Sequence, residues 1–294
     1  MPNKVELNGE DVGGNIRSVE LNKNGENKIQ AIWNERISTT YQMFQSCSSL
    51  LSLDLSHFDT SSVTNMANMF QFCSSLISLD LSNLKTDLVT NMVRMFRRCF
   101  SLTSLDLSNF ATSSGTEIYC MFEYCSSLIS LDLSKFNTSS VTDLGYIFAD
   151  CYSLISLDLS NFNTSLITNM QKMFQNCRSL ISLDLSNFDK SKVTNMDIMF
   201  QGCSSLKYLN LLNSRGSDIF NTIPNSNNLL ICMNNYDNLP DSHNLIQKNA
   251  KNNCSNICFQ KPTILNIENE NCYYNCSKLG DIFFFFVIMI IQKL

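Results

Sequence analysis

The apolar and polar positions of this chain repeat with a period of 26 residues. Leucine recurs three, six and eight positions after each of seven cysteines. An aromatic residue or leucine usually stands eleven positions after the cysteine, and Met-Phe usually closes the unit. No insertion or deletion interrupts the period, so the pattern predicts like units that bury a common core only when they stack. The cysteines that mark the period are Cys47, Cys73, Cys99, Cys125, Cys151, Cys177 and Cys203.

Two kinds of periodicity within each unit predict two elements. The Leu-Asp-Leu triplet alternates apolar and polar positions, as a half-buried β-strand does. Within residues 65–73, Met66, Met69, Phe70 and Cys73 have the spacing of one face of an α-helix. We therefore predict an α/β solenoid of about seven 26-residue rungs, each with a short strand and a short helix, in which neighbouring triplets pair as parallel strands.

The recurring unit also resembles a known family. Residues 73–96 and 177–200 both read Cys-x-Ser-Leu-Ile-Ser-Leu-Asp-Leu-Ser-Asn, followed by Val-Thr-Asn-Met and a closing Met-Phe. This unit is similar to the 26-residue surface-protein repeat of the BspA-like leucine-rich-repeat family, over roughly residues 41–212. The resemblance implies a leucine-rich-repeat solenoid, a surface protein of bacteria or protists, and adhesion or recognition of a host or matrix. It brings no catalytic residues.

The pattern divides the chain into five segments. Residues 1–40 are predicted to be a divergent N-terminal rung or cap, and residues 41–212 form the repeat array. Residues 213–253 are expected to form a C-terminal cap and Asn-rich linker, residues 254–281 a Cys-rich segment, and residues 282–294 a short hydrophobic tail. The tail's apolar run of ten residues is about half of a membrane span, which leaves membrane association through it open. The N-terminus lacks an apolar run long enough for a signal peptide.

Charge and composition restrict the chemistry. The formal net charge of -5 disfavours a nucleic-acid binder held by a basic surface. Only two histidines are available for acid–base or metal chemistry. Because no nucleophile–base pair, phosphate-binding glycine loop or metal triad stands out, we expect no enzyme, no cofactor and no metal site.

One aspartate per rung is the first candidate site. Strand alternation directs these side chains away from the core, and a line of carboxylates is expected to raise each member's pKa by repulsion. Such a strip fits a protein or glycan partner or a calcium ion, but a solvated face whose serines hydrogen-bond the carboxylates also explains it. The six residues are Asp54, Asp80, Asp106, Asp132, Asp158 and Asp184.

The cysteines form two further groups. We considered a metal site and a disulfide ladder for the periodic column, but parallel side chains suit disulfides poorly, so buried free thiols are expected. Cys120 falls on the outward side of its predicted helix and is expected to be exposed, and Cys232 has no evident partner. Two disulfides are the favoured interpretation of a C-terminal quartet, with zinc or no bond as alternatives: Cys254, Cys258, Cys272 and Cys276.

The leading hypothesis is a non-enzymatic, monomeric recognition or adhesion protein that binds an unidentified protein or glycan through its strand face. The resemblance favours a cell-surface or extracellular location. An intracellular, cytoplasmic scaffold is the alternative, favoured by the missing signal peptide and the unpaired thiols, and a truncated gene fragment is a third interpretation.

Overall fold

The computed structural model describes residues 4–7, 10–13, 29–32, 36–53, 55, 58–112, 116–211, 215–216, 229–233 and 250–252. The predictions for residues 254–281 and 282–294, which include the cysteine quartet and the tail, lie outside the described residues. Asp54 also lies outside them.

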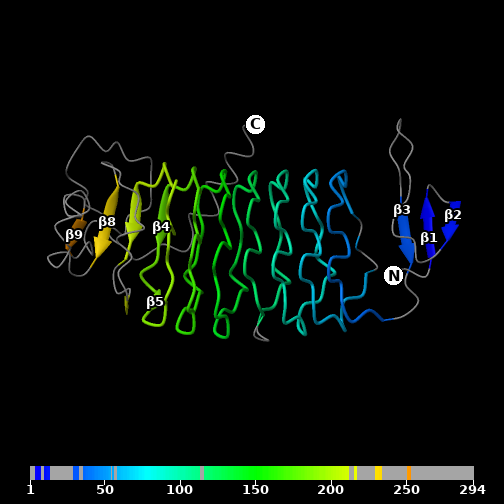
Figure 1. Ribbon diagram of the computed structural model, residues 1–294, viewed down its shortest axis with the longest axis horizontal. Helices are drawn as coiled ribbons and strands as arrows, with labels where there is room; N and C mark the ends of the chain where they lie inside the picture. Colours follow the sequence, from blue (N-terminus) through cyan, green and yellow to red (C-terminus); the bar gives the residue numbers. More distant parts are fainter. Residues whose placement is uncertain are drawn as a thin grey trace.

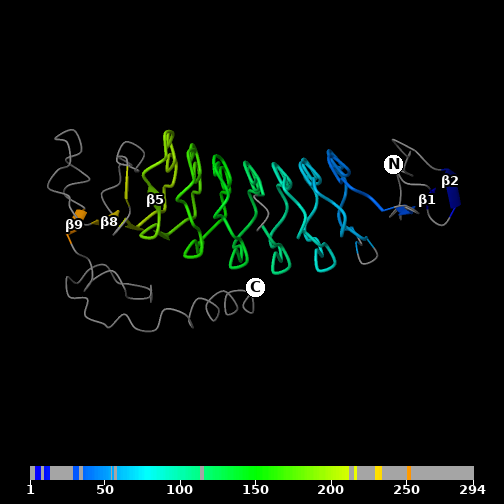
Figure 2. The same ribbon diagram turned by 90° about the horizontal axis from the view of Figure 1, so that it is seen from below.

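The described residues between 36 and 211 form a solenoid of parallel rungs (Figures 1 and 2). Equivalent residues of successive rungs lie side by side, so the predicted 26-residue period is confirmed in space. Isolated parallel bridges mark this register, at Thr39–Asn65, Asn65–Asn91, Asn91–Glu117, Asp143–Asn169 and Asn169–Asn195.

Paired strands occur at the C-terminal end of the array. β4 (Ser182–Asp184) pairs in parallel with β6 (Tyr208–Asn210), and β6 with β8 (Leu230–Met233), which pairs with β9 (Ala250–Asn252). β5 (Asp189–Lys190) pairs in parallel with β7 (Arg215–Gly216). The parallel sheet therefore continues beyond residue 212, where the sequence pattern decays.

The earlier Leu-Asp-Leu triplets are not paired strands, so that part of the prediction is wrong for residues 79–81, 105–107, 131–133 and 157–159. Neighbouring rungs are instead joined just before the triplet, as where the Thr103 amide donates to the Ile77 carbonyl at 3.2 Å. A turn ends at Leu76 and another begins at Asp80.

The predicted helix is also wrong, because the described residues contain no helix. Over residues 66–73 the backbone amides alternate between two kinds of acceptor. Those of Asn68, Phe70 and Phe72 donate at 2.9 Å to carbonyls of the next rung, whereas Met69 and Cys73 donate to carbonyls three residues back. A helix would direct every amide along its own axis, so the apolar spacing is right but the backbone pairs across rungs.

Positive φ angles explain why no helix forms. Among the described residues they occur in two columns only, five positions and one position before each cysteine of the period, and such a conformation ends a helix. Most of these residues are not glycine, so the strain must be offset by hydrogen bonds between rungs. The columns are Gln42, Asn68, Arg94, Cys120, Tyr146, Lys172 and Ile198, and Ser46, Phe72, Arg98, Tyr124, Asp150, Asn176 and Gly202.

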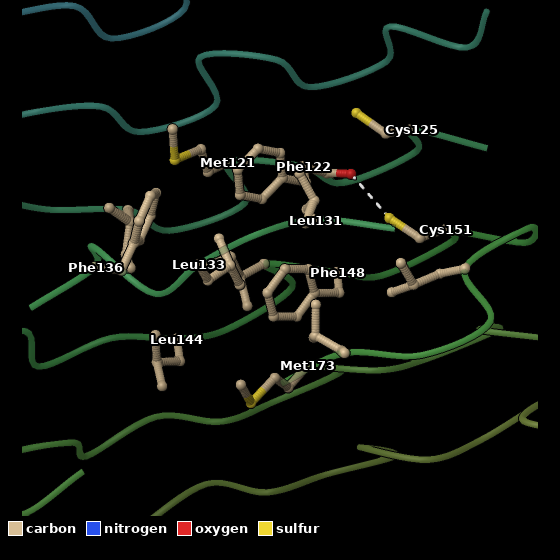
Figure 3. Close-up of a cluster of buried hydrophobic side chains, with 14 of the residues drawn as sticks. Met121, Phe122, Cys125, Leu131, Leu133, Phe136, Leu144, Phe148, Cys151 and Met173 are labelled. Atoms are coloured by element: carbon tan, nitrogen blue, oxygen red, sulfur yellow. Dashed lines mark hydrogen bonds between the residues drawn. The ribbon is translucent and has the colours of Figure 1, made fainter. Parts of the chain in front are cut away.

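A file of stacked phenylalanine rings fills the core. Successive rings lie 5.6–5.9 Å apart between centroids, with interplanar angles of 13° or less. Figure 3 shows Phe122 and Phe148 of this file among leucine and methionine side chains from neighbouring rungs. The file consists of Phe44, Phe70, Phe96, Phe122, Phe148, Phe174 and Phe200.

A buried threonine in each rung ties the backbone of the next. Its hydroxyl accepts from an amide 25 residues ahead at 2.7–2.8 Å and donates to the carbonyl of that same residue at 2.9–3.2 Å. Lys190 occupies this column in the last full rung and is also buried. The members of the threonine file are Thr60, Thr86, Thr112, Thr138 and Thr164.

The N-terminal strands form a separate arrangement. β1 (Lys4–Leu7) pairs with β2 (Glu10–Gly13) and with β3 (Ile29–Ile32), both antiparallel, in the order β2-β1-β3. This antiparallel sheet lies within the segment expected to be a divergent rung or cap.

Candidate binding faces of the repeat array

The aspartate file is exposed, and each described member has a local structural role. One carboxylate oxygen accepts a hydrogen bond at 2.9 Å from the backbone amide two residues later, which is the geometry of an Asx turn. Asp184 uses its second oxygen as well, accepting from the side-chain amide of Asn210 at 3.0 Å. The regular aspartate is therefore explained in part by the turn that follows the triplet. The described members are Asp80, Asp106, Asp132, Asp158 and Asp184.

The expected rise in pKa by mutual repulsion is wrong at Asp106. The backbone amide of Ser108 donates to its carboxylate and lowers the pKa below its usual value, and the Ser108 side chain acts in the same direction. The charge of Asp80 acts in the opposite direction but is the smaller effect. A hydrogen bond to the ionised form thus outweighs repulsion from the next rung.

An exposed aliphatic file runs beside the aspartate file, three positions earlier in each rung. Its members are 39–59% exposed, and Thr103 takes the same place in one rung. The sequence interpretation missed this file. The sequence does show it, because an apolar residue usually follows the leucine that stands three positions after each cysteine. We call the two files together the strand face; the aliphatic members are Leu51, Ile77, Ile129, Ile155 and Ile181.

The cysteine column lies inside the array from its second member onward. Each of these thiols donates to the phenylalanine carbonyl 29 residues earlier at 3.0–3.2 Å, as Figure 3 shows for Cys151 and Phe122. Burial raises their thiol pKa values, to about 12 at Cys73 and Cys203. Cys47, in the first rung, is exposed, so its expected burial is wrong. All seven members of the column are free thiols.

Two single cysteines differ from expectation. Cys120 is buried, with 2% of its surface exposed, so its predicted outward position is wrong. The prediction assumed a helix, whereas Cys120 has a φ of 55° within a turn, and this conformation directs its side chain differently. Burial raises the pKa of the Cys120 thiol to about 12. Cys232, for which the sequence suggested no partner, is disulfide-bonded.

Aromatic and cationic side chains gather on a second surface, formed by the turns on either side of each cysteine. Six cation–ring pairs lie there with 4.7–5.9 Å between the cationic group and the ring centroid. The sequence interpretation missed this turn face, because its residues vary from rung to rung and carry no period. Its cations are Arg94, Arg97, Arg98, Lys172 and Arg178, and its rings are Phe72, Tyr119, Tyr124, Tyr146 and Tyr152.

The described part of the chain offers neither a cluster of metal-ligating side chains nor a membrane-spanning helix. No group of three or more His, Cys, Asp or Glu side chains there is arranged to hold a metal ion. That part also has no helix with the length and hydrophobicity needed to traverse a bilayer.

Parallel rungs of constant length, joined by backbone hydrogen bonds and packed around a file of stacked phenylalanine rings, define a repeat solenoid. The family model described as "Mycoplasma protein of unknown function, DUF285" matches residues 38–153 and 103–214. Together the two matches span more than half of the chain, so this protein belongs to that family.

Comparison with solved structures identifies a similar repeat protein. The crystal structure of a leucine-rich repeat protein from Bacteroides ovatus is similar over 75% of this chain, at 21% sequence identity and a TM-score of 0.33. This chain covers 57% of that protein's chain. No curated protein matches.

Proposed function

We propose that this protein is a non-enzymatic recognition protein of the BspA-like leucine-rich-repeat type, which binds a protein or glycan at the cell surface through its strand face. The observation that carries the proposal is the exposed aliphatic file beside the aspartate file. A row of exposed apolar side chains next to charge is a candidate interaction surface in a soluble protein.

The chemistry of the strand face supports a mixed ligand surface. The apolar side chains are not needed at their positions, because Thr103 occupies the same place without disturbing the stack. An Asx turn requires only one carboxylate oxygen. At Asp132 and Asp158 the second oxygen therefore suits a cationic or N–H group of a partner.

The cysteines support an extracellular location without a disulfide ladder. At a pKa of about 12 only about one thiol in 10⁵ is ionised at pH 7, and the thiolate is the reactive form. Buried thiols of this kind are compatible with an oxidising compartment, and the disulfide at Cys232 favours one. The free thiols therefore do not favour the cytoplasmic scaffold over the surface protein.

Location is tested by labelling intact cells that produce the tagged full-length chain with a membrane-impermeant amine reagent. Labelling of the tagged protein but not of a cytoplasmic marker supports the surface proposal. Labelling only after lysis supports the scaffold instead.

Binding is tested with beads coated with the full-length chain and presented to purified matrix proteins and glycans. The triple variants Ile129→Thr/Ile155→Thr/Ile181→Thr and Asp106→Asn/Asp132→Asn/Asp158→Asn should each lower retention at least about tenfold, a loss of about 1.4 kcal/mol. Thr is tolerated at position 103 of the same column, and Asn keeps the turn acceptor, so both variants should remain folded. Exposed Lys85→Gln/Lys135→Gln is the control. Unchanged retention in both triple variants contradicts the strand face as the binding surface.

A further inference from the structure

Three arginines and the rings around them form a cluster on the turn face. Arg98 lies between two rings of its own column, with its guanidinium carbon 5.1 Å from the Phe72 centroid and 5.0 Å from the Tyr124 centroid. Arg94 lies 5.6 Å from the centroid of Tyr119 in the next rung. Both guanidinium groups are therefore held by aromatic rings from adjacent rungs.

The charges of this cluster are only partly balanced. Arg97 forms a two-pronged ion pair with Glu123, whose carboxylate raises the pKa of Arg97. In the part of the chain that the structure describes, Arg94 and Arg98 have no ion pair. Farther along the same face, Asp150 already accepts from the side-chain amide of Asn176 and is not directed at the arginines.

The fold does not require this cluster. The column that contains Arg98 holds Asp150, Asn176 and Gly202 in other rungs with the same positive φ. The Nε of Arg98 is buried and lacks a hydrogen-bond partner among the described residues, which costs stability. A costly arrangement that the repeat does not need indicates a role in binding.

The geometry suits a carboxylated sugar chain. A guanidinium group binds a carboxylate through two parallel N–H···O bonds. The side chain of Phe100 is 38% exposed, and its ring meets the Tyr124 ring edge to face with 6.3 Å between the centroids. The Phe100 ring therefore offers an apolar surface to the C–H face of a pyranose. A ligand lying along the array meets further cations at Lys172 and Arg178.

We infer that the turn face around Arg94 and Arg98 binds an acidic polysaccharide that contains uronate residues. Such a chain carries fewer charges per unit length than duplex DNA, which fits a protein with a net charge of -5 and only a local basic cluster. This site uses other residues than the strand face and does not rest on the function proposed for it.

Binding of polygalacturonate to the full-length chain, measured by biolayer interferometry at low salt, tests the inference. The wild-type protein should bind polygalacturonate and not neutral dextran, with affinity that falls as salt rises. Arg94→Gln/Arg98→Gln should weaken binding at least about tenfold. Lys85→Gln/Lys135→Gln makes the same change in net charge on exposed residues outside the turn face, and should change affinity less than about twofold.

Circular dichroism establishes that each variant is folded. If Arg98→Gln does not fold, Arg94→Gln/Phe100→Ala replaces it, with the same expected loss. Equal losses in the turn-face and control variants, or no binding of polygalacturonate to the wild type, overturn the inference. Tighter, arginine-dependent binding of poly(dT) would overturn it in favour of single-stranded nucleic acid. The aspartate and isoleucine variants of the strand face should bind polygalacturonate as the wild type does, so the two proposals fail independently.

Discussion

The threonine file makes a quantitative prediction about how the rungs are held together. Thr138 is fully buried, and its hydroxyl accepts from the Asn163 amide at 2.8 Å and donates to the Asn163 carbonyl at 2.9 Å. Thr138→Val keeps the shape of the side chain and removes both hydrogen bonds. At about 1 kcal/mol for each net hydrogen bond, the variant should lose about 2 kcal/mol of stability.

Thr168→Val is the matched control. Thr168 is exposed, and its hydroxyl makes a single bond to the Thr142 carbonyl at 3.2 Å. Water can replace that bond, so the same substitution should cost less than about 1 kcal/mol. The two variants differ only in which column loses its hydroxyl.

Urea unfolding followed by circular dichroism gives the stability, and hydrogen exchange at the Asn163 amide gives a local measure. The Thr138→Val midpoint should fall well below that of Thr168→Val, with faster exchange at Asn163. Equal midpoints for the two variants, or an unchanged exchange rate at Asn163, would refute the inter-rung role of the threonine hydroxyl.

Three further predictions concern the core, the thiols and the buried lysine. Phe122→Ala removes a fully buried ring that is stacked on both sides, and should lower the free energy of unfolding in urea by about 3–5 kcal/mol. Phe100 is exposed, so Phe100→Ala should lower it by less than about 1 kcal/mol. Equal losses would contradict a stabilising role of the ring file. A thiol reagent at pH 8, followed by peptide mapping, should label Cys47 and leave Cys125 unmodified until the protein unfolds, and equal labelling would contradict the burial. Burial lowers the pKa of Lys190 to about 8, below its unfolded value of about 10.5. Between these two pH values the unfolded chain binds more protons than the folded one, so the free energy of unfolding increases as the pH rises. Lys190→Thr should therefore raise the free energy of unfolding most below pH 8, and the increase should become smaller between pH 8 and about 10.5. An increase that is the same at every pH would contradict the lowered pKa of Lys190.

Some features followed directly from the residues. The cysteine and leucine columns fixed the rung length, because a period without insertions admits only one register of stacking. The inward leucines and the core position of the phenylalanines followed for the same reason. The aspartate column was recognised as outward-facing, but its part in a turn was missed, because an Asx turn depends on which amide the carboxylate meets.

The helix was mispredicted for a physical reason. Met66, Met69, Phe70 and Cys73 satisfy the spacing of a helical face, yet the same spacing serves two successive turns with a residue of positive φ in each. Propensity offered no warning, since residues such as Phe72 seldom adopt that conformation. The misplaced exposure of Cys120 followed from the same error.

The sequence by itself determined the rung length, the identity of the columns and the membership of the core, since these depend on periodicity and apolarity alone. Only the tertiary structure decided which backbone amides pair across rungs, and hence that the rungs are built of turns. It also decided which variable side chains meet on the turn face. Arg98, Phe72 and Tyr124 are 26 residues apart, and only the stacking of successive rungs makes them neighbours.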